Sequence, residues 1–292
     1  MYAVTLLSNP DQPVLDTHMI DSLRNAWGGS DAEWLSRGEA AEFFVEQKPG
    51  NQWDVWQDLQ GMGLDLVVQE AVGRRKKMLL ADMDSTMIQQ ECIDELADVA
   101  GVGARVKDIT ARAMNGELDF EGALTERVGL LTGLDEAVIG EVLDTRITLM
   151  PGGKALLATM KAHGAYAALV SGGFTAFTQS VAAQLGFDEN RANTLVTEGG
   201  KLTGEVGRPI LGRDAKVAAL AEISTQLGIA ESDVIAVGDG ANDLGMLHRA
   251  GMGVALHAKP SVAAECEIRI NHGDLTALLY VQGYKRDEFA PV

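Results

Sequence analysis

The chain has 292 residues, of which 46% are hydrophobic, and a formal net charge of −18. This length and composition exclude a disordered chain and predict a sizeable core, in two domains or in one domain with an insertion. The strong negative charge argues against nucleic acid or an anionic membrane surface as a partner.

Cysteine usage and hydrophobic runs indicate where the protein works. Cys92 and Cys266 are the only cysteines, too few and too far apart for a disulfide framework or a metal cluster. The N-terminus has no basic region and too short an apolar run for a signal peptide, and no stretch approaches the length of a membrane span. The histidines show no ligand spacing, which argues against zinc. We therefore expect a cytoplasmic protein without a membrane partner.

Residues 1–72 are expected to form a separate small domain. Apolar spacing predicts a β-α-β-β-α-β order, which is the ferredoxin-like arrangement. The expected strands and helices are Tyr2–Leu7, Val14–Trp27, a short strand near Trp34, Phe43–Val45, Trp53–Leu59 and Leu64–Val68. The segment holds no catalytic constellation. A regulatory, ligand-binding or homodimer-forming role stays open beside that of a passive appended domain.

The remaining residues, 73–292, carry the chemistry. A basic run, Arg74–Lys77, is interpreted as a solvated linker. The apolar run Met78–Ala81 follows and predicts a strand buried on both faces, with Asp82 and Asp84 directly at its end. Open α/β sheets place their chemistry at the carboxyl ends of strands, so this aspartate pair is a candidate site.

Residues from about 89 to 149 show apolar positions at three- and four-residue steps, punctuated by glycine. An all-helical block directly after a candidate catalytic strand is expected to be a cap over the site. Beyond it, strands and helices alternate. The fold class is therefore α/β, with a doubly wound, mostly parallel sheet, a helical cap insertion and the small α+β domain at the N-terminus.

Two further strand ends carry polar signatures. Ser171-Gly172-Gly173 is expected to follow a strand over 165–170, and Gly238-Asp239-Gly240-Ala241-Asn242-Asp243 to follow a strand over 233–237. Lys216 lies near the start of a helix expected over 215–227. Each signature alone is a common turn or a solvated side chain, but the ordered set is specific.

This set suits phosphoryl transfer. A carboxylate such as Asp82 needs no deprotonation to attack phosphorus, and Asp84 is placed to protonate the leaving oxygen and then activate water. Mg²⁺ held by Asp82, Asp239 and a backbone carbonyl at Asp84 would offset the phosphate charge. The remaining phosphate contacts are assigned to Lys216, the Ser171 hydroxyl and the backbone N–H groups of Gly172 and Gly173. Asn242 and Asp243 would orient the metal shell and Lys216.

The ordered motifs resemble those of the haloacid dehalogenase-like superfamily and, within it, the phosphoserine phosphatases. The matching positions are Asp82 and Asp84, then Ser171, then Lys216, then Asp239 with Asn242 and Asp243. The resemblance implies that Asp82 is the nucleophile, that Asp84 is the acid and base, that Mg²⁺ is the cofactor, and that the substrate is a small phosphorylated amino acid. Residues 1–72 resemble, loosely, the amino-acid-binding type of regulatory domain that some bacterial members carry.

The family's pattern also suggests how phosphoserine would be recognised. It has a glutamate at the position of Glu91 and an arginine after an apolar pair in the cap, which Met114, Phe120 and Arg127 match here. Glu91 would bind the ammonium group and Arg127 the carboxylate, through its planar fork. The alternatives are that Glu91 is a solvated acid at a helix start and that Arg127 pairs with Glu121 or Glu126.

The leading expectation is Mg²⁺-dependent hydrolysis of O-phosphoserine to serine and phosphate, and three alternatives to it stay open. The substrate would be another small phosphorylated amino acid such as phosphohomoserine, or the phosphoryl group would pass to an acceptor alcohol instead of water. In a different class, the protein would be an amino-acid sensor with a structural metal site. Ser171 and Lys216 argue against the sensor, because a structural Mg²⁺ site needs neither residue.

Overall fold

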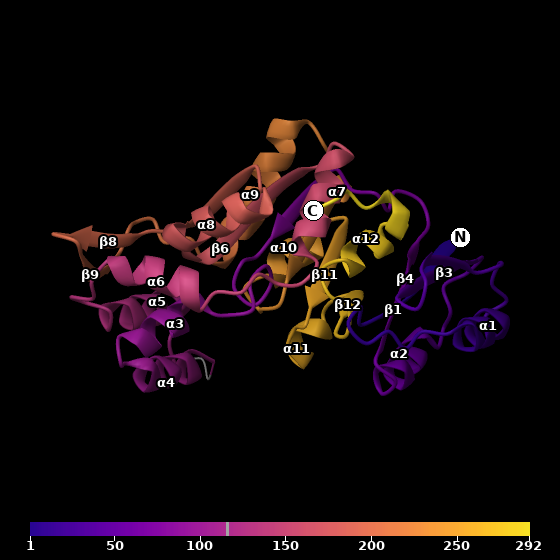
Figure 1. Ribbon diagram of the computed structural model, residues 1–292, viewed down its shortest axis with the longest axis horizontal. Coiled ribbons are helices and arrows are strands. Elements are labelled where there is room, and N and C mark those ends of the chain that lie inside the picture. Colours follow the sequence, from indigo (N-terminus) through magenta and orange to yellow (C-terminus); the bar gives the residue numbers. More distant parts are fainter. Residues whose placement is uncertain (115–116) are drawn as a thin grey trace. The chain divides into compact units, whose positions relative to one another are not determined.

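The computed structural model describes residues 1–114 and 117–292. The chain divides into two compact units. One comprises Met1–Leu80, Pro151–Ala167 and Leu220–Val292, and the other comprises Ala81–Met150 and Ala168–Ala219. Figure 1 shows the elements of both.

The N-terminal part of the first unit is a four-stranded antiparallel sheet with two helices. Its elements are β1 (Tyr2–Ser8), α1 (Thr17–Ala26), β2 (Glu33–Ser36), β3 (Ala40–Val45), α2 (Gln52–Gln60) and β4 (Leu64–Glu70). The strand order is β2-β3-β1-β4. This order and the element succession confirm the predicted ferredoxin-like part of the fold class.

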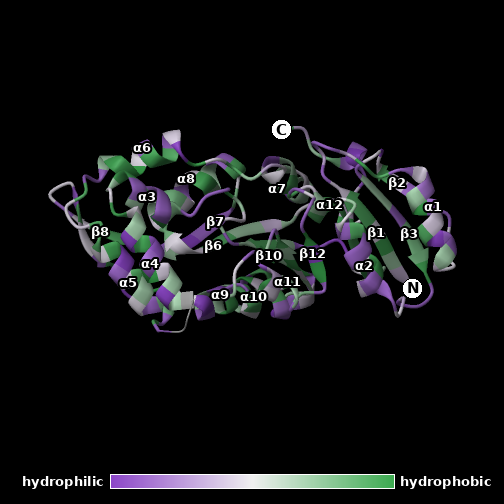
Figure 2. Ribbon diagram, turned by 90° about the horizontal axis from the view of Figure 1, so that it is seen from below, coloured by the Kyte–Doolittle hydropathy of each residue, from purple (hydrophilic) through white to green (hydrophobic). Residues whose placement is uncertain are grey.

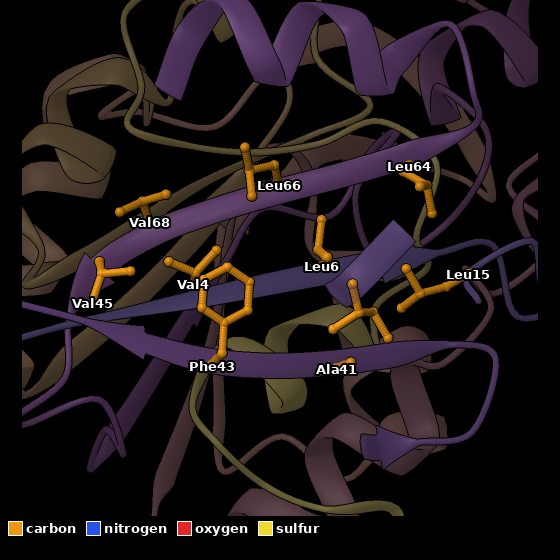
Figure 3. Packing of buried hydrophobic residues seen from close by; sticks show 10 residues of the cluster. Val4, Leu6, Leu15, Ala41, Phe43, Val45, Leu64, Leu66 and Val68 are labelled. Carbon is orange, nitrogen blue, oxygen red and sulfur yellow. The ribbon is translucent and has the colours of Figure 1, made fainter. Parts of the chain in front are cut away.

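The core of this sheet follows from the two-residue period of its strands. Figure 3 shows Val4 and Leu6 of β1, Phe43 of β3 and Leu66 of β4 packed in one cluster. Apolar residues of α1 and α2 pack against this cluster, and both helices lie on the same side of the sheet (Figure 1). Helix α1 begins later than its apolar spacing predicts, because the Asp16 side chain caps it by accepting from the Met19 N–H at 2.8 Å.

The second sheet has six strands in the order β12-β11-β10-β5-β6-β7. These strands are β5 (Met78–Ala81), β6 (Tyr166–Phe174), β7 (Glu189–Asn193), β10 (Val234–Gly238), β11 (Met252–Leu256) and β12 (Ile268–Ile270). The pairs β10–β11, β11–β12 and β6–β7 are parallel, and every residue of β5 and β10 is buried. The predicted parallel α/β sheet is thereby confirmed.

Helices and short turns follow most of these strands. They are α7 (Gly153–Ala162), α8 (Thr175–Leu185), α9 (Arg213–Leu227), the 3₁₀ turn η1 (Glu231–Asp233), α10 (Leu244–Arg249), α11 (Pro260–Ala263), α12 (Ala277–Val281) and the 3₁₀ turn η2 (Arg286–Glu288). Figure 2 shows α10 and α11 on one side of β10 and β12, and α7 and α12 on the other, with the strand β12 mainly hydrophobic. In the described residues, no helix has the length and apolar character that a membrane crossing requires.

The second unit contains the helical block that the sequence predicts as a cap. Its helices are α3 (Cys92–Val99), α4 (Gly103–Met114), α5 (Phe120–Gly129) and α6 (Ala137–Thr145), and the hairpin of β8 (Leu195–Glu198) and β9 (Lys201–Val206) joins them. An antiparallel bridge between Ile88 and Leu149 holds the two ends of the block together. The block therefore leaves and re-enters the core through one narrow connection.

The end predicted for one strand is wrong. The strand expected to end at residue 170 continues as β6 to Phe174, so Ser171, Gly172 and Gly173 lie inside a strand and not after one. Its pairing with β7 is irregular there, because residues 170 to 174 of β6 oppose only residues 191 to 193 of β7. Such bulges are common beside active sites, where they redirect the backbone. The sequence analysis also missed β7, α11 and α12, which are short or weakly patterned.

The basic run is solvated only in part, because Arg75 and Lys77 are exposed while Arg74 is largely buried. Arg74 forms an ion pair with Glu42 of β3 at 2.7 Å, and both side chains are largely buried. Lys77 pairs with Asp233 at 3.0 Å, and the Lys76 backbone N–H donates to the Gln282 side chain. The cations of this run therefore join the N-terminal sheet to the rest of its unit.

Candidate active site

Asp82 and Lys216 form the centre of the site. Asp82 directly follows the buried strand β5, and Lys216 lies in the first turn of α9. Lys216 Nζ lies 2.6 Å from Asp82 Oδ1, with side-chain exposures of 2% and 7%. Both charges are removed from water, which is tolerated only when they are paired.

The chain turns sharply after Asp82. The backbone N–H groups of Thr86, Met87 and Ile88 all point at the Met83 carbonyl oxygen, at 2.8 to 3.2 Å. Ser85 has φ of 55°, a left-handed conformation that is uncommon for a residue with a side chain. Backbone strain of this kind gathers at functional sites. Because the backbone turns here, Asp84 stays close to the end of β5.

Asp84 lies in surroundings that disfavour its ionised form. Burial and the nearby negative charge of Glu91 raise its pKa to about 7, while the Cys92 backbone N–H donates to Asp84 Oδ1 at 3.2 Å and opposes the rise. A pKa near neutrality lets one group both give and take a proton under the same conditions.

The bulge of strand β6 lies against Asp84. The Gly173 N–H donates to Ser171 Oγ at 2.9 Å. A Cβ placed on Gly173 would lie 2.8 Å from Asp84 Oδ2, and a Cβ on Gly172 would lie 3.1 Å from Cζ of Phe120. Only residues without a side chain permit this close approach of backbone to neighbouring groups.

An acidic cluster is also present. Asp82, Asp239 and Asp243 each place one carboxylate oxygen so that the three lie within 4.8 Å of one another. Asp243 Oδ2 accepts from the N–H groups of Asp239 and Gly240, at 3.2 and 2.9 Å, which orders the loop after β10. Asn242 lies in the same loop. Three clustered carboxylates are a donor set that suits a divalent cation.

The sequence analysis named Asp84 as the third metal residue and gave Asp243 only an orienting role. The carboxylate cluster contains Asp243 and not the Asp84 side chain. The prediction for Asp84 concerned its backbone carbonyl. Asp243 returns to Asp239 through a tight turn at Gly240, where an added Cβ would collide with Asn242 Oδ1.

Glu91 lies at the start of α3, close to the catalytic turn. Its side chain is exposed and accepts a hydrogen bond from Ser85 Oγ at 2.7 Å. It is near enough to Asp84 to raise the pKa of that carboxyl. The Glu91 carboxylate therefore lies beside both Ser85 and Asp84.

Arg127 of α5 is half-buried, and its Nε donates to the Ala123 carbonyl at 3.3 Å. Burial lowers its pKa, and the nearby carboxylates that oppose this are Asp94, Glu91 and Asp84. The Arg127 guanidinium therefore lies in the same cluster of charged side chains as Glu91.

The two acids considered as alternative partners of Arg127 are paired elsewhere. Arg208 contacts Glu121 at 3.3 Å, and Arg112 contacts Glu126 at 3.0 Å. Pairing of Arg127 with these neighbours on its own helix is not what the described residues show.

Of the two apolar cap residues, Phe120 is well defined. It is the first residue of α5, and its ring lies against both Gly172 and Gly212. Met114 is the last residue of α4, and its side chain lies outside the described part of the structure. Sequence reasoning also missed Asn193, a fully buried residue whose side chain bonds Gly172 and Leu211. No local pattern marks it.

Comparison with known proteins defines the class. The family model for haloacid dehalogenase-like hydrolases matches residues 79–248. The chain belongs to the haloacid dehalogenase-like hydrolase family. The matched region covers Asp82, Asp84, Ser171, Lys216 and Asp239, so the family resemblance drawn from the motifs is confirmed.

Individual relatives narrow the class further. The chain is 42% identical over 229 residues to a phosphoserine phosphatase of Streptomyces coelicolor, covering 78% of this chain and 56% of that protein. Matches to the first three curated relatives cover 56% to 65% of their length, so the chain spans less than two thirds of each.

Solved structures agree on the fold. A haloacid dehalogenase-family hydrolase of Salmonella enterica serovar Typhi superposes with a TM-score of 0.86 at 30% identity, covering 96% of this chain and 98% of that one. A phosphoserine phosphatase, described as an analogue of its phospho-aspartyl intermediate, has a TM-score of 0.66 at 40% identity, covering 70% of this chain and 98% of that one.

Proposed function

We propose that this protein is a Mg²⁺-dependent phosphatase that hydrolyses O-phospho-L-serine to L-serine and phosphate. The observation that carries the proposal is the buried contact of 2.6 Å between Asp82 and Lys216 at the end of β5. The names of the Streptomyces relative and of the phospho-aspartyl analogue support the same substrate and intermediate.

Asp82 is the nucleophile in this proposal. Its ionised carboxylate attacks phosphorus, a bond forms from Asp82 to phosphorus, and the ester bond to the serine oxygen breaks. Asp84, protonated at the outset, gives its proton to that departing oxygen. Water then attacks the acyl phosphate, Asp84 takes a proton from it, and Asp82 is released with inorganic phosphate. The pKa of about 7 at Asp84 supports both proton transfers.

The phosphoryl oxygens need donors that are already in place when negative charge shifts during the reaction. We assign this role to Lys216, to the Ser171 hydroxyl and to the backbone N–H groups of Gly172 and Gly173. The close approach of Gly173 to Asp84 and Ser171 supports the assignment, because it brings these donors beside the proton-transferring group.

Asp82, Asp239 and Asp243 would hold the metal ion. Their carboxylate oxygens lie within 4.8 Å of one another, a spacing at which one cation can contact all three. Divalent cations such as Mg²⁺ prefer oxygen ligands, and Mg²⁺ is the ion we propose. When bound, the ion offsets the repulsion between the Asp82 carboxylate and the phosphate.

Two cap residues would select the substrate. Glu91 would bind the ammonium group of phosphoserine and Arg127 its carboxylate, with Phe120, Met114 and Asn242 around them. The shared electrostatic environment of Arg127, Glu91 and Asp84 supports this, because a zwitterion beside the phosphate needs both signs of charge near the acid. We extend the proposal to the limits of the phosphatase domain, 73–292, to the cap at 89–149 and to a cytoplasmic location.

The test is phosphate release from a panel of phosphomonoesters, with Mg²⁺ and with EDTA. The panel contains phosphoserine, phosphothreonine, phosphohomoserine, phosphoglycolate and a sugar phosphate. We expect strong preference for phosphoserine, abolished by EDTA and restored by Mg²⁺. Preference for phosphohomoserine would keep Asp82 as nucleophile and overturn the substrate, and added acceptor alcohols would reveal transfer in place of hydrolysis.

A matched pair of variants tests the nucleophile. Asp82→Asn should lose turnover while remaining folded, because an amide cannot form the acyl phosphate. Asp214→Asn, the same change on an exposed carboxylate of α9, should leave turnover unchanged. Turnover retained by Asp82→Asn would overturn the proposal and favour the sensor.

A further inference from the structure

Strand β6 leaves its regular pairing with β7 at the bulge beside Asp84. Residues 170 to 174 of β6 oppose only residues 191 to 193 of β7. Backbone groups inside such a bulge lose their ladder partners, and a buried carbonyl without a partner is costly. The Gly172 carbonyl is one of these groups, and its partner comes from a side chain.

That side chain is Asn193, the last residue of β7, which is 1% exposed. Asn193 Nδ2 donates to the Gly172 carbonyl at 2.9 Å. It also donates to the Leu211 carbonyl at 3.0 Å, and Asn193 Oδ1 accepts from the Leu211 N–H at 2.7 Å. The Asn193 Nδ2 atom faces two carbonyl oxygens and the Oδ1 atom faces one N–H group, so the orientation of the side-chain amide is unambiguous.

The two segments joined in this way both carry proposed phosphate donors. Gly172 lies between Ser171 and Gly173. Leu211 lies in the loop that enters α9. It is five positions before Lys216, which lies in the first turn of that helix. The Asn193 amide binds the Leu211 backbone at both its N–H and its carbonyl, as a neighbouring strand would, so the loop entering α9 cannot shift or rotate without breaking two hydrogen bonds.

The Phe120 ring contacts the same two segments from the cap. A Cβ on Gly172 would lie 3.1 Å from the ring, and so would a Cβ on Gly212. The surface that receives the first residue of α5 is therefore made by the two segments that Asn193 holds together. A shift of either segment would change both the phosphate donors and the contact with the cap.

We propose that Asn193 is a positioning residue for phosphoryl transfer, which fixes the backbone N–H groups of the β6 bulge relative to Lys216. This inference rests on the proposed function. Asn193 touches no reacting atom and acts through Gly172 and Leu211. Donors that are held in place matter most as charge moves in the transition state, so loss of the clamp should lower kcat more than it raises KM.

The experiment compares Asn193→Ala with Asn190→Ala, using the full chain, Mg²⁺, and two substrates, phosphoserine and p-nitrophenyl phosphate. Asn190 lies on the same strand. Among the described residues, its side chain accepts a hydrogen bond from the Thr178 hydroxyl of α8, at 2.9 Å, and contacts neither Gly172 nor Leu211 through a hydrogen bond. We expect Asn193→Ala to lose kcat about tenfold or more on both substrates with KM changed about threefold or less. Asn190→Ala should keep wild-type kcat. Asn193→Ser, which retains one donor, should fall between the two and serves if the alanine variant does not fold.

A second readout does not depend on catalysis. Hydrogen–deuterium exchange should rise in residues 170–174 and 208–216 of the Asn193 variants and not in the Asn190 variant. Wild-type kcat in folded Asn193→Ala, or unchanged exchange in both segments, would overturn the inference. Failure of the wild type to hydrolyse either ester would instead overturn the proposed function, while the exchange data would still decide whether the clamp exists.

Discussion

Arg74 and Glu42 form a buried ion pair at 2.7 Å, with side-chain exposures of 11% and 7%. The pair joins the segment that follows β4 to β3, an inner strand of the N-terminal sheet. The Arg74 guanidinium also lies 5.7 Å from the centre of the Phe44 ring and closely approaches Gly283. A charge held in this way depends on its partner, because water does not reach it.

Removing one partner of this pair should be costly. Arg74→Ala leaves the Glu42 carboxylate buried and unpaired, and we expect a loss of about 3–5 kcal/mol in the free energy of unfolding. Arg249→Ala removes an equally short but more exposed pair with Glu231, and should cost much less, because water screens exposed charges. Urea denaturation of both variants measures the difference. Equal losses would show that burial does not set the strength of the Arg74 pair.

Asp65 of β4 should anchor the N-terminal four-stranded sheet. Its carboxylate is fully buried and accepts from three consecutive backbone N–H groups, those of Asn271, His272 and Gly273, each at 2.9 Å. Asp65→Ala leaves these donors without a partner, at about 1–3 kcal/mol for each that water cannot reach. We expect a lower unfolding midpoint and faster proteolysis near residues 60–75. Asp58→Ala on α2 is the control, and the same loss there would contradict the anchor.

Asp84 should make the metal-free protein less stable at high pH. Its pKa of about 7 lies above that of an ordinary aspartate, so the folded state holds a proton that the unfolded state has already released. Stability therefore falls as pH rises from the unfolded pKa to about 7, and stays lower above it. Asp84→Asn lacks this titration. We compare the Tm of Asp84→Asn with that of the wild type in EDTA. The Tm of the variant minus that of the wild type should be about 2–5 °C larger at pH 8.5 than at pH 5.5.

Asp214→Asn, on the exposed face of α9, provides the reference for this pH series. It should track the wild type across the range. A Tm difference between Asp84→Asn and the wild type that does not change with pH would show that Asp84 is an ordinary ionised carboxylate.

Gly173 should tolerate no side chain. In Gly173→Ala the new methyl group would meet Asp84 Oδ2 at 2.8 Å and Ser171 Oγ at 3.1 Å, so the proposed acid and phosphate donor must both move. We expect kcat/KM to fall about 100-fold, in line with the sensitivity of catalysis to misplacement by an ångström. Gly129→Ala, in α5 with nothing within 4 Å of the new Cβ, should keep full activity and gain about 0.5–1 kcal/mol. Normal activity in Gly173→Ala would separate the bulge from the chemistry.

The sequence by itself determined the elements whose signals are local. Strand β5 was predictable because four apolar residues end abruptly in two aspartates, and helix α9 because its pattern surrounds Lys216 over many residues. The ordered motifs Asp82 to Asp243 were recognisable because strand ends in an α/β sheet carry polar residues at known places. Family and fold class followed from them.

The tertiary structure alone decided the contacts that join distant segments. Asp65 bonds residues more than 200 positions away, Arg74 reaches Glu42, and Asn193 bonds Gly172 and Leu211. Nothing in the residues beside them marks these side chains, because the partner of a buried polar group is a backbone atom that the fold brings near and not a neighbour in the chain. The same holds for the pKa of Asp84, which burial raises, and burial belongs to the whole fold.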